Sequence, residues 1–306
     1  MRFGEPIRIG IVDFDTSHVV EFSKRINHAG VSEDQWVHGG RVVAGYPGVS
    51  EITPAETIEA YTAQCRDECG VEIVDRPEAL LDKVDAVMIE SQCGAVHLER
   101  ARPFLEAGMP VFIDKPFANT VEQAWALVDL ADENGARLFS SSSLRYALEV
   151  QSLKRDKSEL GDIMVVDATS PGSLHPSNPG LLHYGIHGVE IVYALLGSGC
   201  KYVTCNSTDA GDYVLGTWHD GGVGIVRAMR QGDHGFSVAA WGEKGSRESP
   251  IDTTFIYREL LVEVIKMFEH GPDHRLIGET IEIISFIEAA ARSAATGGEP
   301  ALVGIY

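Results

Sequence analysis

The stretch that decides the fold is VFIDKPFA, Val111 to Ala118. Its first four residues predict a short buried strand. Pro116 ends that strand, because proline has no N–H for the sheet and holds the residue before it extended. We therefore expect Lys115 at the carboxyl end of a strand, the edge where open α/β sheets bind ligands. A solvated lysine beside a turn is the alternative interpretation, since charged side chains are mostly exposed.

Around this stretch, short apolar strands alternate with helices, which predicts a parallel, doubly wound sheet. The expected strands cover 7–13, 41–46, 71–74, 84–90, 111–114 and 137–140, and the expected helices cover 16–27, 56–69, 76–82, 95–107 and 121–134. A strand, a tight turn and a helix at the start are typical of a dinucleotide-binding domain. We therefore predict an α/β fold whose residues 1–145 form a Rossmann-like domain.

The first turn of this domain has an unusual composition. Dinucleotide-binding folds place G-x-G-x-x-G there, and the glycines let the backbone approach a pyrophosphate closely. This chain has no glycine at those positions, which hold Asp13, Phe14, Asp15, Thr16, Ser17 and His18. The two aspartates would repel a phosphate, whereas the hydroxyls, the imidazole and the helix N-terminus can donate hydrogen bonds to one. An ordinary Asp/Thr cap before a helix is the alternative.

The pattern changes after residues 140–145, where four serines and Arg145 put hydroxyl and guanidinium donors at the same edge as Lys115. A helix over 147–160 is followed by strands at 162–168, 202–206, 213–218, 223–229 and 236–241, and helices over 255–269 and 279–296 come last. Gly, Asp and Asn between the strands favour an antiparallel sheet. We predict that residues 146–306 form an α+β domain with an open, mainly antiparallel sheet.

An uncovered face of that sheet would be a liability in a monomer, so we expect it to pair with a second copy. The apolar residues that could supply the face are Val223, Ile225, Val226, Val238, Ala240 and Trp241. Cover by the two C-terminal helices is the alternative.

Residues 181–196, LLHYGIHGVEIVYALL, predict a helix with a polar stripe. His183, His187 and Glu190 are spaced i, i+4 and i+7, so they share one side. Two histidines one turn apart can close on a metal ion, and a carboxylate one turn on can be a third ligand or orient a histidine. A histidine also suits proton transfer near neutral pH, because its unperturbed pKa is about 6.5.

A metal site could draw on a second group of residues. Asp13, Asp15, His18 and His97 are also expected near the carboxyl edge of the first sheet, where they would favour a metal-assisted reaction.

Composition limits the partners. A net charge of −20 argues against nucleic acid and anionic membranes. No apolar run approaches a membrane span, and the segment MRFGEPIRIG lacks a signal-peptide core, so we expect a cytoplasmic protein. Five scattered cysteines without a C-x-x-C pair predict free thiols.

Four segments in order resemble the glucose–fructose oxidoreductase / inositol dehydrogenase / MocA (Gfo/Idh/MocA) family. They are HLERARPFLEAGMP at 97–110, VFIDKPFA at 111–118 with Asp114 for the usual Glu, LLHYGIHGVE at 181–190, and EAAARSAATGGEPALV at 288–303. The resemblance implies a Rossmann-like domain followed by an α/β domain with an open sheet. It also implies an NAD- or NADP-dependent oxidoreductase of a sugar, polyol or related small molecule, working as a dimer or tetramer.

The resemblance also implies a role for several residues, and it implies no resident metal. Lys115 would contact substrate and cofactor ribose, and His187 would transfer the proton, with His183 where the family has an aspartate. The residues expected at the cofactor are Asp13, Phe14, Asp15, Thr16, Ser17, His18, Glu90 and Lys115, and those expected at the substrate are Arg145 and Tyr184.

Three departures from the family pattern keep two alternatives open. The glycine turn is replaced, Tyr46-Pro47 stands where an acid often holds the ribose, and His183 replaces an aspartate. One alternative is a ligand-binding or regulatory protein that has lost hydride transfer. The other is a metal-assisted enzyme that uses His183, His187 and Glu190.

Overall fold

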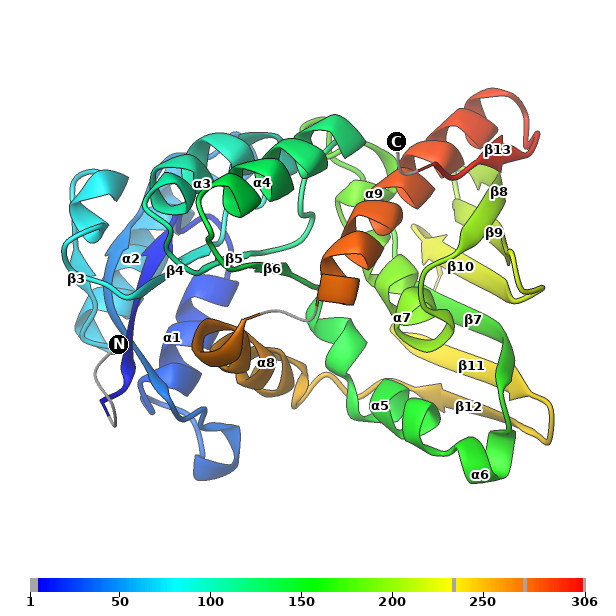
Figure 1. Cartoon of the computed structure of the whole chain (residues 1–306), viewed down its shortest axis with the longest axis horizontal. Coiled ribbons are helices and arrows are strands. Elements are labelled where there is room, and N and C mark those ends of the chain that lie inside the picture. Colours follow the sequence, from blue (N-terminus) through cyan, green and yellow to red (C-terminus); the bar gives the residue numbers. More distant parts are fainter. Residues whose placement is uncertain (1–4, 233–234, 272–273, 305–306) are drawn as a thin grey trace. The chain divides into compact units, whose positions relative to one another are not determined.

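The computed structural model describes residues 5–232, 235–271 and 274–304, except the side chains of residues 157, 274 and 275. The chain forms two compact units (Figure 1). The first comprises Met1–Ala118, Glu122–Ser141 and Tyr257–Ile277, and the second comprises Asn119–Val121, Ser142–Ile256 and Gly278–Tyr306. The expected single boundary between residues 145 and 146 therefore differs from the structure mainly at Tyr257–Ile277, which returns to the first unit.

The first unit is built on a six-stranded sheet with the order β3-β2-β1-β4-β5-β6. Its strands are β1 Ile7–Val12, β2 Gly40–Tyr46, β3 Glu72–Ile73, β4 Ala86–Ile89, β5 Val111–Ile113 and β6 Leu138–Ser140, and all neighbours pair in parallel. Its helices are α1 His18–Ile26, α2 Ala55–Asp67, α3 His97–Glu106, α4 Val121–Glu133 and α8 Ile256–His270, with 3-10 turns at η1 Glu33–Gln35, η2 Pro77–Leu80 and η3 Gly94–Val96. The predicted parallel, doubly wound sheet is confirmed. The strand order reverses between β1 and β4, which is where such sheets bind ligands.

Helix α8 joins the first unit through close packing against the start of β2. A side chain at Gly39 or Gly40 would collide with Ile265, so these two glycines let α8 approach. The Arg137 guanidinium donates to the carbonyl of Phe268 at 2.7 Å, which fixes the end of the helix. No local pattern could have assigned α8 to a unit whose strands lie more than a hundred residues earlier in the chain.

The second unit is built on a seven-stranded sheet with the order β12-β11-β7-β10-β9-β8-β13. Its strands are β7 Ile163–Pro171, β8 Cys200–Thr208, β9 Gly211–Trp218, β10 Val223–Met229, β11 Ser237–Gly242, β12 Ser246–Pro250 and β13 Ala301–Leu302. Only β7 and β10 pair in parallel among these, so the mainly antiparallel sheet is confirmed. The strands β12 and β13 were not predicted.

The helices of the second unit are α5 Leu148–Arg155, α6 Lys157–Leu160, α7 Ile186–Leu196 and α9 His274–Ala295, with 3-10 turns at η4 Ser143–Tyr146 and η5 Gly180–Leu182. The helix expected over 147–160 is thus broken at Asp156, and the helix expected from residue 181 begins only at Ile186. Within the described residues, we find no helix that is both long and apolar enough to cross a membrane.

The two faces of the second sheet differ in how far helices cover them. On one face, Val192 of α7 lies over Gly224 and Phe286 of α9 lies against Gly216. Strand alternation sends every second residue to the other face, where Leu215 and Trp241 remain 40% and 43% exposed. The residues proposed for a single open face therefore divide: Val226, Val238 and Ala240 are buried, and Val223, Ile225 and Trp241 lie on the opposite face.

The close approach of α7 to β10 gives a first prediction. A Cβ at Gly224 would lie 2.5 Å from Val192 Cγ1, so Gly224→Ala should lower the free energy of unfolding by about 1–3 kcal/mol through overpacking. The control is Gly235→Ala, because a Cβ there meets no atom of the described residues within 4 Å, and it should change stability by less than about 0.5 kcal/mol. Urea unfolding measures both. Equal effects would show that α7 does not pack on β10 in this way.

Candidate active site

In the first unit, acidic residues follow three neighbouring strands. Asp13 comes directly after β1, Glu90 after β4 and Asp114 after β5, and the three strands are adjacent and parallel. The backbone ladder continues through these residues, since Glu90 N donates to Val12 O and Asp114 N to Ile89 O, both at 2.9 Å. Their side chains are therefore fixed at the carboxyl edge of the sheet.

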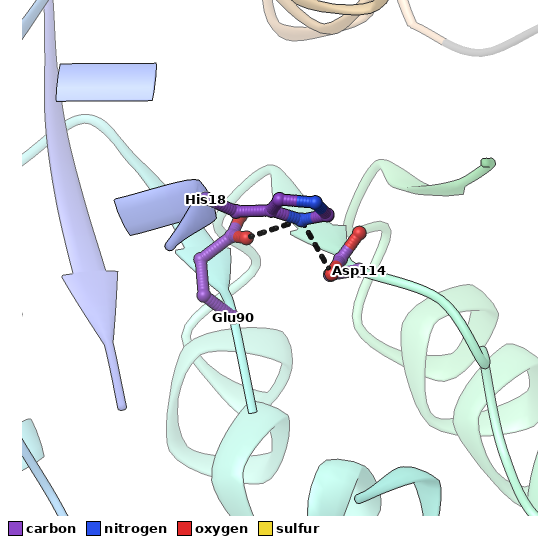
Figure 2. A group of neighbouring side chains, drawn as sticks. All are labelled: His18, Glu90 and Asp114. Carbon is purple, nitrogen blue, oxygen red and sulfur yellow. Dashed lines mark hydrogen bonds and ion pairs between the residues drawn. The ribbon is translucent and has the colours of Figure 1, made fainter. Parts of the chain in front are cut away.

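Two of these acids meet a histidine from the start of α1. Figure 2 shows Glu90 and Asp114 directed toward the same side of the His18 ring. His18 Nδ1 lies 2.8 Å from Asp114 Oδ2 and 3.9 Å from Glu90 Oε2. All three are buried, with exposed fractions of 8%, 0% and 1% for His18, Glu90 and Asp114. Packing orients the imidazole, which stacks on Phe22 and meets the edge of Tyr257.

The two carboxyls of this cluster have opposite protonation preferences. Burial and the nearby Asp114 charge raise the pKa of Glu90 well above its ordinary value. Burial alone would also raise the pKa of Asp114, but the charges of His18 and Lys115 and the hydrogen bond from His18 hold it well below its usual range. Without another cation, Asp114 is therefore the carboxylate and Glu90 the protonated acid.

Lys115 follows Asp114 at the end of β5, where the sequence predicted it. The residue is only 9% exposed, and its ammonium nitrogen lies 3.7 Å from Asp114 Oδ2. The solvated lysine of the alternative interpretation is thus contradicted by the burial. A buried ammonium group at this edge can stabilise negative charge on a bound ligand.

In the turn after β1, protein partners hold both aspartates. Asp13 has a φ of 63°, a conformation usually left to glycine, and its Oδ2 accepts from Arg100 Nε at 2.9 Å and from Ser91 Oγ at 2.6 Å. Asp15 Oδ1 accepts from the Gln92 N–H at 3.0 Å. Neither carboxylate stands as an isolated charge where a phosphate would lie.

The other residues predicted at this turn differ in character. Phe14 is fully buried, and a side chain at Gly45 would collide with its ring, so Phe14 belongs to the core rather than to a ligand contact. Thr16 Oγ1 accepts from His18 N at 3.4 Å, and the Ser17 side chain makes no cap bond at the start of α1. His97 is not a ligand candidate either, because its two ring nitrogens lie near the carbonyls of Ser91 and Phe117.

In the second unit, His187 is held by a buried polar network. Ser142 Oγ lies 2.7 Å from His187 Nδ1, and the Ser142 N–H donates to Glu190 Oε1 at 3.0 Å. Arg145 donates from Nε to Glu190 Oε2 at 2.7 Å and forms an ion pair with Glu279 at 2.6 Å. The guanidinium is thus bound to two carboxylates, so we assign Arg145 to this network and not to the substrate.

The metal alternative built on His183, His187 and Glu190 does not match this geometry. His183 lies before α7, which begins at Ile186, so the three residues do not form one helical stripe. Glu190 already accepts from Ser142 and Arg145. Among the residues that the structure describes, only His18, Glu90 and Asp114 bring three such ligand atoms within 4.8 Å of one another. Tyr184 is 36% exposed and lies edge-on to the His187 ring, and its role at the substrate stays a prediction.

Sequence reasoning missed the partners of these side chains. Nothing local pairs Ser142 with His187, Glu279 with Arg145, or Asp114 with His18, because each pair is at least 45 residues apart. The one usable signal was the position of Asp114 before Lys115 at a strand end.

A cavity of about 330 Å³ lies beyond the carboxyl end of β2. Its lining comes from the loop after β2 and the first turns of α2: Pro47, Gly48, Val49, Ser50, Thr53, Ala55, Ile58, Glu59 and Thr62. In a dinucleotide-binding fold, the adenosine half lies at this strand end.

Comparison with known proteins agrees with the fold and the motifs. Residues 49–142 match an oxidoreductase family with an NAD-binding Rossmann fold, GFO_IDH_MocA. This segment is therefore similar to the Gfo/Idh/MocA family. The resemblance predicted from the sequence is thereby confirmed, and the matched segment includes Glu90 and Lys115.

Similarity to a curated enzyme is limited to part of the chain. An inositol 2-dehydrogenase/D-chiro-inositol 3-dehydrogenase from Halalkalibacterium halodurans is 31% identical over 107 residues. That match spans 35% of this chain and 29% of the relative.

Solved structures match over nearly the whole length. GenD2 from gentamicin A biosynthesis, in complex with NAD, has a TM-score of 0.79 at 18% identity and covers 99% of this chain and 98% of its own. A myo-inositol dehydrogenase from Lactobacillus casei, in complex with NAD(H) and myo-inositol, has a TM-score of 0.77 at 18% identity, with coverage of 99% and 98%. At this identity the likeness shows that the fold is shared.

The buried Asp15 gives a prediction for pH. Burial raises its pKa to about 6, above the value of about 3.9 in an unfolded chain. A raised pKa means that the folded state binds the proton more tightly, so this contribution to stability is present below about pH 4 and is lost as the pH rises through about 6. Asp15→Asn should therefore match the wild type near pH 4 and be more stable by about 1–3 kcal/mol near pH 7.5. Thermal or urea unfolding at the two pH values measures this.

The control for this comparison is Asp82→Asn at an exposed position, which should follow the wild type at both pH values. Equal stability of Asp15→Asn and wild type at neutral pH would contradict the burial of a titrating Asp15.

Proposed function

We propose that this protein is an NAD-dependent oxidoreductase that acts on a polyol or sugar. The observation that carries the proposal is the match of residues 49–142 to the NAD-binding oxidoreductase family, with a buried Lys115 at the strand end within that segment. The inositol dehydrogenases among the similar proteins support the substrate class. The cofactor, the substrate and the residue roles below are parts of this proposal.

The residues of the first unit fit a dinucleotide despite the missing glycines. Asp13 takes the left-handed conformation that glycine would supply, and Arg100 forms an ion pair with its carboxylate at 2.9 Å, so the negative charge of Asp13 is compensated. The N-terminus of α1 offers N–H groups for a pyrophosphate. The cavity beyond β2 offers space for an adenosine.

The cavity beyond β2 also bears on the choice between NAD and NADP. Glu59 of α2 is part of its lining, whereas the position directly after β2 has no acid. A carboxylate there can accept hydrogen bonds from ribose hydroxyls and would repel the 2′-phosphate of NADP. We therefore assign NAD as the cofactor.

The proposed hydride transfer uses the cofactor and two side chains. When bound, the nicotinamide ring supplies the acceptor or donor of a hydride. Lys115 stabilises negative charge that develops on the substrate oxygen. His187 takes or returns the hydroxyl proton, and because Ser142 bonds to Nδ1, the transfer uses Nε2. Tyr184 beside it is assigned to substrate contact.

Arg145 and Glu190 act as positioning residues for His187. Arg145 holds one oxygen of Glu190, and the other oxygen accepts from the Ser142 backbone, which sets the Ser142 hydroxyl against the imidazole. His183 lies one residue before Tyr184, with its ring 5.4 Å from the ring of His175. We keep His183 as a neighbour of the proton-transfer group rather than as its partner.

The function is tested by cofactor binding and turnover. NADH should bind in a fluorescence titration, and NADPH should bind more weakly. With NAD and a panel of inositols and aldoses, Lys115→Met and His187→Asn should each lower kcat by at least about 100-fold, because each removes charge stabilisation or proton transfer. His187→Asn should keep the NADH titration within a few-fold of the wild type.

The matched controls are Lys201→Met and His219→Asn, which change the same residue types at exposed positions and should leave kcat unchanged. If neither NADH nor NADPH binds at about millimolar concentration, the proposal is overturned. Stabilisation by sugars alone would then support the second candidate, a ligand-binding protein without hydride transfer.

We also infer that the protein is a cytoplasmic homo-oligomer. None of its five cysteines forms a disulfide in the structure, which fits a reducing compartment. The open face of the second sheet carries Leu215 and Trp241, with Val223 and Ile225 between them in the strand pairing. A second copy of the same face would bury these side chains, and a symmetric dimer is the commonest way to do so.

The dimer is tested by light scattering at micromolar concentration. The wild type should scatter as a dimer or a larger even assembly, and Trp241→Glu should shift it to monomer because a charge then faces its own symmetry mate. Leu148→Glu, at an exposed site on α5, is the control and should leave the mass unchanged. A monomeric wild type would overturn the proposal.

A further inference from the structure

We propose that His18, Glu90 and Asp114 form a binding site for a divalent transition-metal ion such as zinc or manganese. The three side chains come from three separate elements: the start of α1, the end of β4 and the end of β5. One imidazole and two carboxylates are a donor set that such ions accept. The proposal does not depend on the nicotinamide cofactor.

The distances suit one ion. Metal–ligand bonds of about 2.0–2.2 Å to nitrogen and oxygen place neighbouring ligand atoms roughly 3–3.5 Å apart. His18 Nδ1 is 2.8 Å from Asp114 Oδ2 and 3.9 Å from Glu90 Oε2, and all three ligand atoms lie within 4.8 Å of one another. Small rotations of the two carboxyls would close the set. The ion would take the place of the hydrogen bond between His18 Nδ1 and Asp114 Oδ2.

An independent observation points to a missing ligand. Glu90 is fully buried, and neither of its carboxyl oxygens has a hydrogen-bond partner among the described residues. Asp114 Oδ1 is likewise buried without such a partner. Buried polar groups are almost always satisfied, because leaving one without a partner costs free energy. Both carboxyls belong to the cluster in Figure 2, so one bound cation would satisfy them together.

The surroundings of the three side chains suit a cation that keeps at least one coordination position open. Lys115, 3.7 Å from Asp114 Oδ2, supplies only a single positive charge to the two acids. His18 is oriented by Phe22 and Tyr257, so its ring needs no rearrangement to serve as a ligand. Three protein ligands leave at least one position for water or for an oxygen of a bound molecule, as in catalytic metal sites.

The test is metal binding by the full chain, expressed without a histidine tag and treated with a chelator. Titration calorimetry with zinc chloride or manganese chloride should show one ion per chain, and the melting temperature should rise with the ion. Glu90→Gln, which keeps the shape but removes the charge, should weaken binding at least about 10-fold, as should His18→Gln.

The control is the double variant His28→Gln/His38→Gln. It removes two neighbouring histidines outside the cluster, whose ring centres are 4.9 Å apart. It should bind the ion as the wild type does. X-ray absorption of the zinc-loaded wild type supplies a readout that needs no variant: one imidazole and oxygen ligands are expected.

Three results would overturn the proposal. They are the absence of stoichiometric binding by any of these ions, sulfur ligands in the absorption spectrum, and binding lost in the His28/His38 variant but kept in Glu90→Gln. In each case Glu90 would be a buried protonated acid beside the His18–Asp114 pair.

Discussion

The hydrogen bond between His18 and Asp114 is the interaction on which the candidate site depends. It joins the start of α1 to the end of β5 across β4, at 2.8 Å and with both groups buried. Removing either partner would leave the other polar group buried without compensation, which is costly. The bond also keeps Asp114 ionised, and that charge holds the Lys115 ammonium at the sheet edge and favours the protonated form of Glu90.

Elsewhere the chain pairs its buried acids with donors. Asp13 accepts from Arg100 and Ser91, and Glu190 accepts from Arg145 and Ser142. In the second unit, Glu282 accepts from the Tyr193 hydroxyl and from the backbone N–H groups of Gly199 and Cys200. Glu90 differs, because its oxygens have no hydrogen-bond partner among the described residues. Asp13 and Asp114 each keep one oxygen without such a partner, but among the described residues only Glu90 has both oxygens in that state.

Sequence patterns predicted the strands and helices well where a short run of neighbouring residues determines the structure. The apolar runs of β4 and β5 and the stop at Pro116 indicated both strands and the place of Lys115. The same reasoning failed where a long-range contact decides the outcome. Helix α8 packs against Gly39 and Gly40 of a distant strand, and the helix expected from residue 181 begins only at Ile186.

Site geometry was harder to predict than the fold for the same physical reason. A side chain's residue type and its strand-end position can be read from the sequence, but its partner is fixed by packing in three dimensions. His18 was expected at a phosphate and instead bonds to Asp114, 96 residues away. Arg145 was expected at the substrate and instead binds Glu190 and Glu279.

The loss of the glycine turn and the presence of the three-residue cluster have one electrostatic explanation. At the carboxyl edge, Arg100 compensates Asp13, and His18 with Lys115 compensates Asp114. Glu90 and Asp15 are left, and burial is the largest cause of the raised pKa of each. Of these two, only Glu90 belongs to the His18–Glu90–Asp114 cluster, where its carboxylate and that of Asp114 would together match the charge of one divalent cation. A cation bound at the cluster would add positive charge close enough to Asp15 to offset part of the negative charge that replaces the glycines, because the Asp15 charge already acts on Glu90.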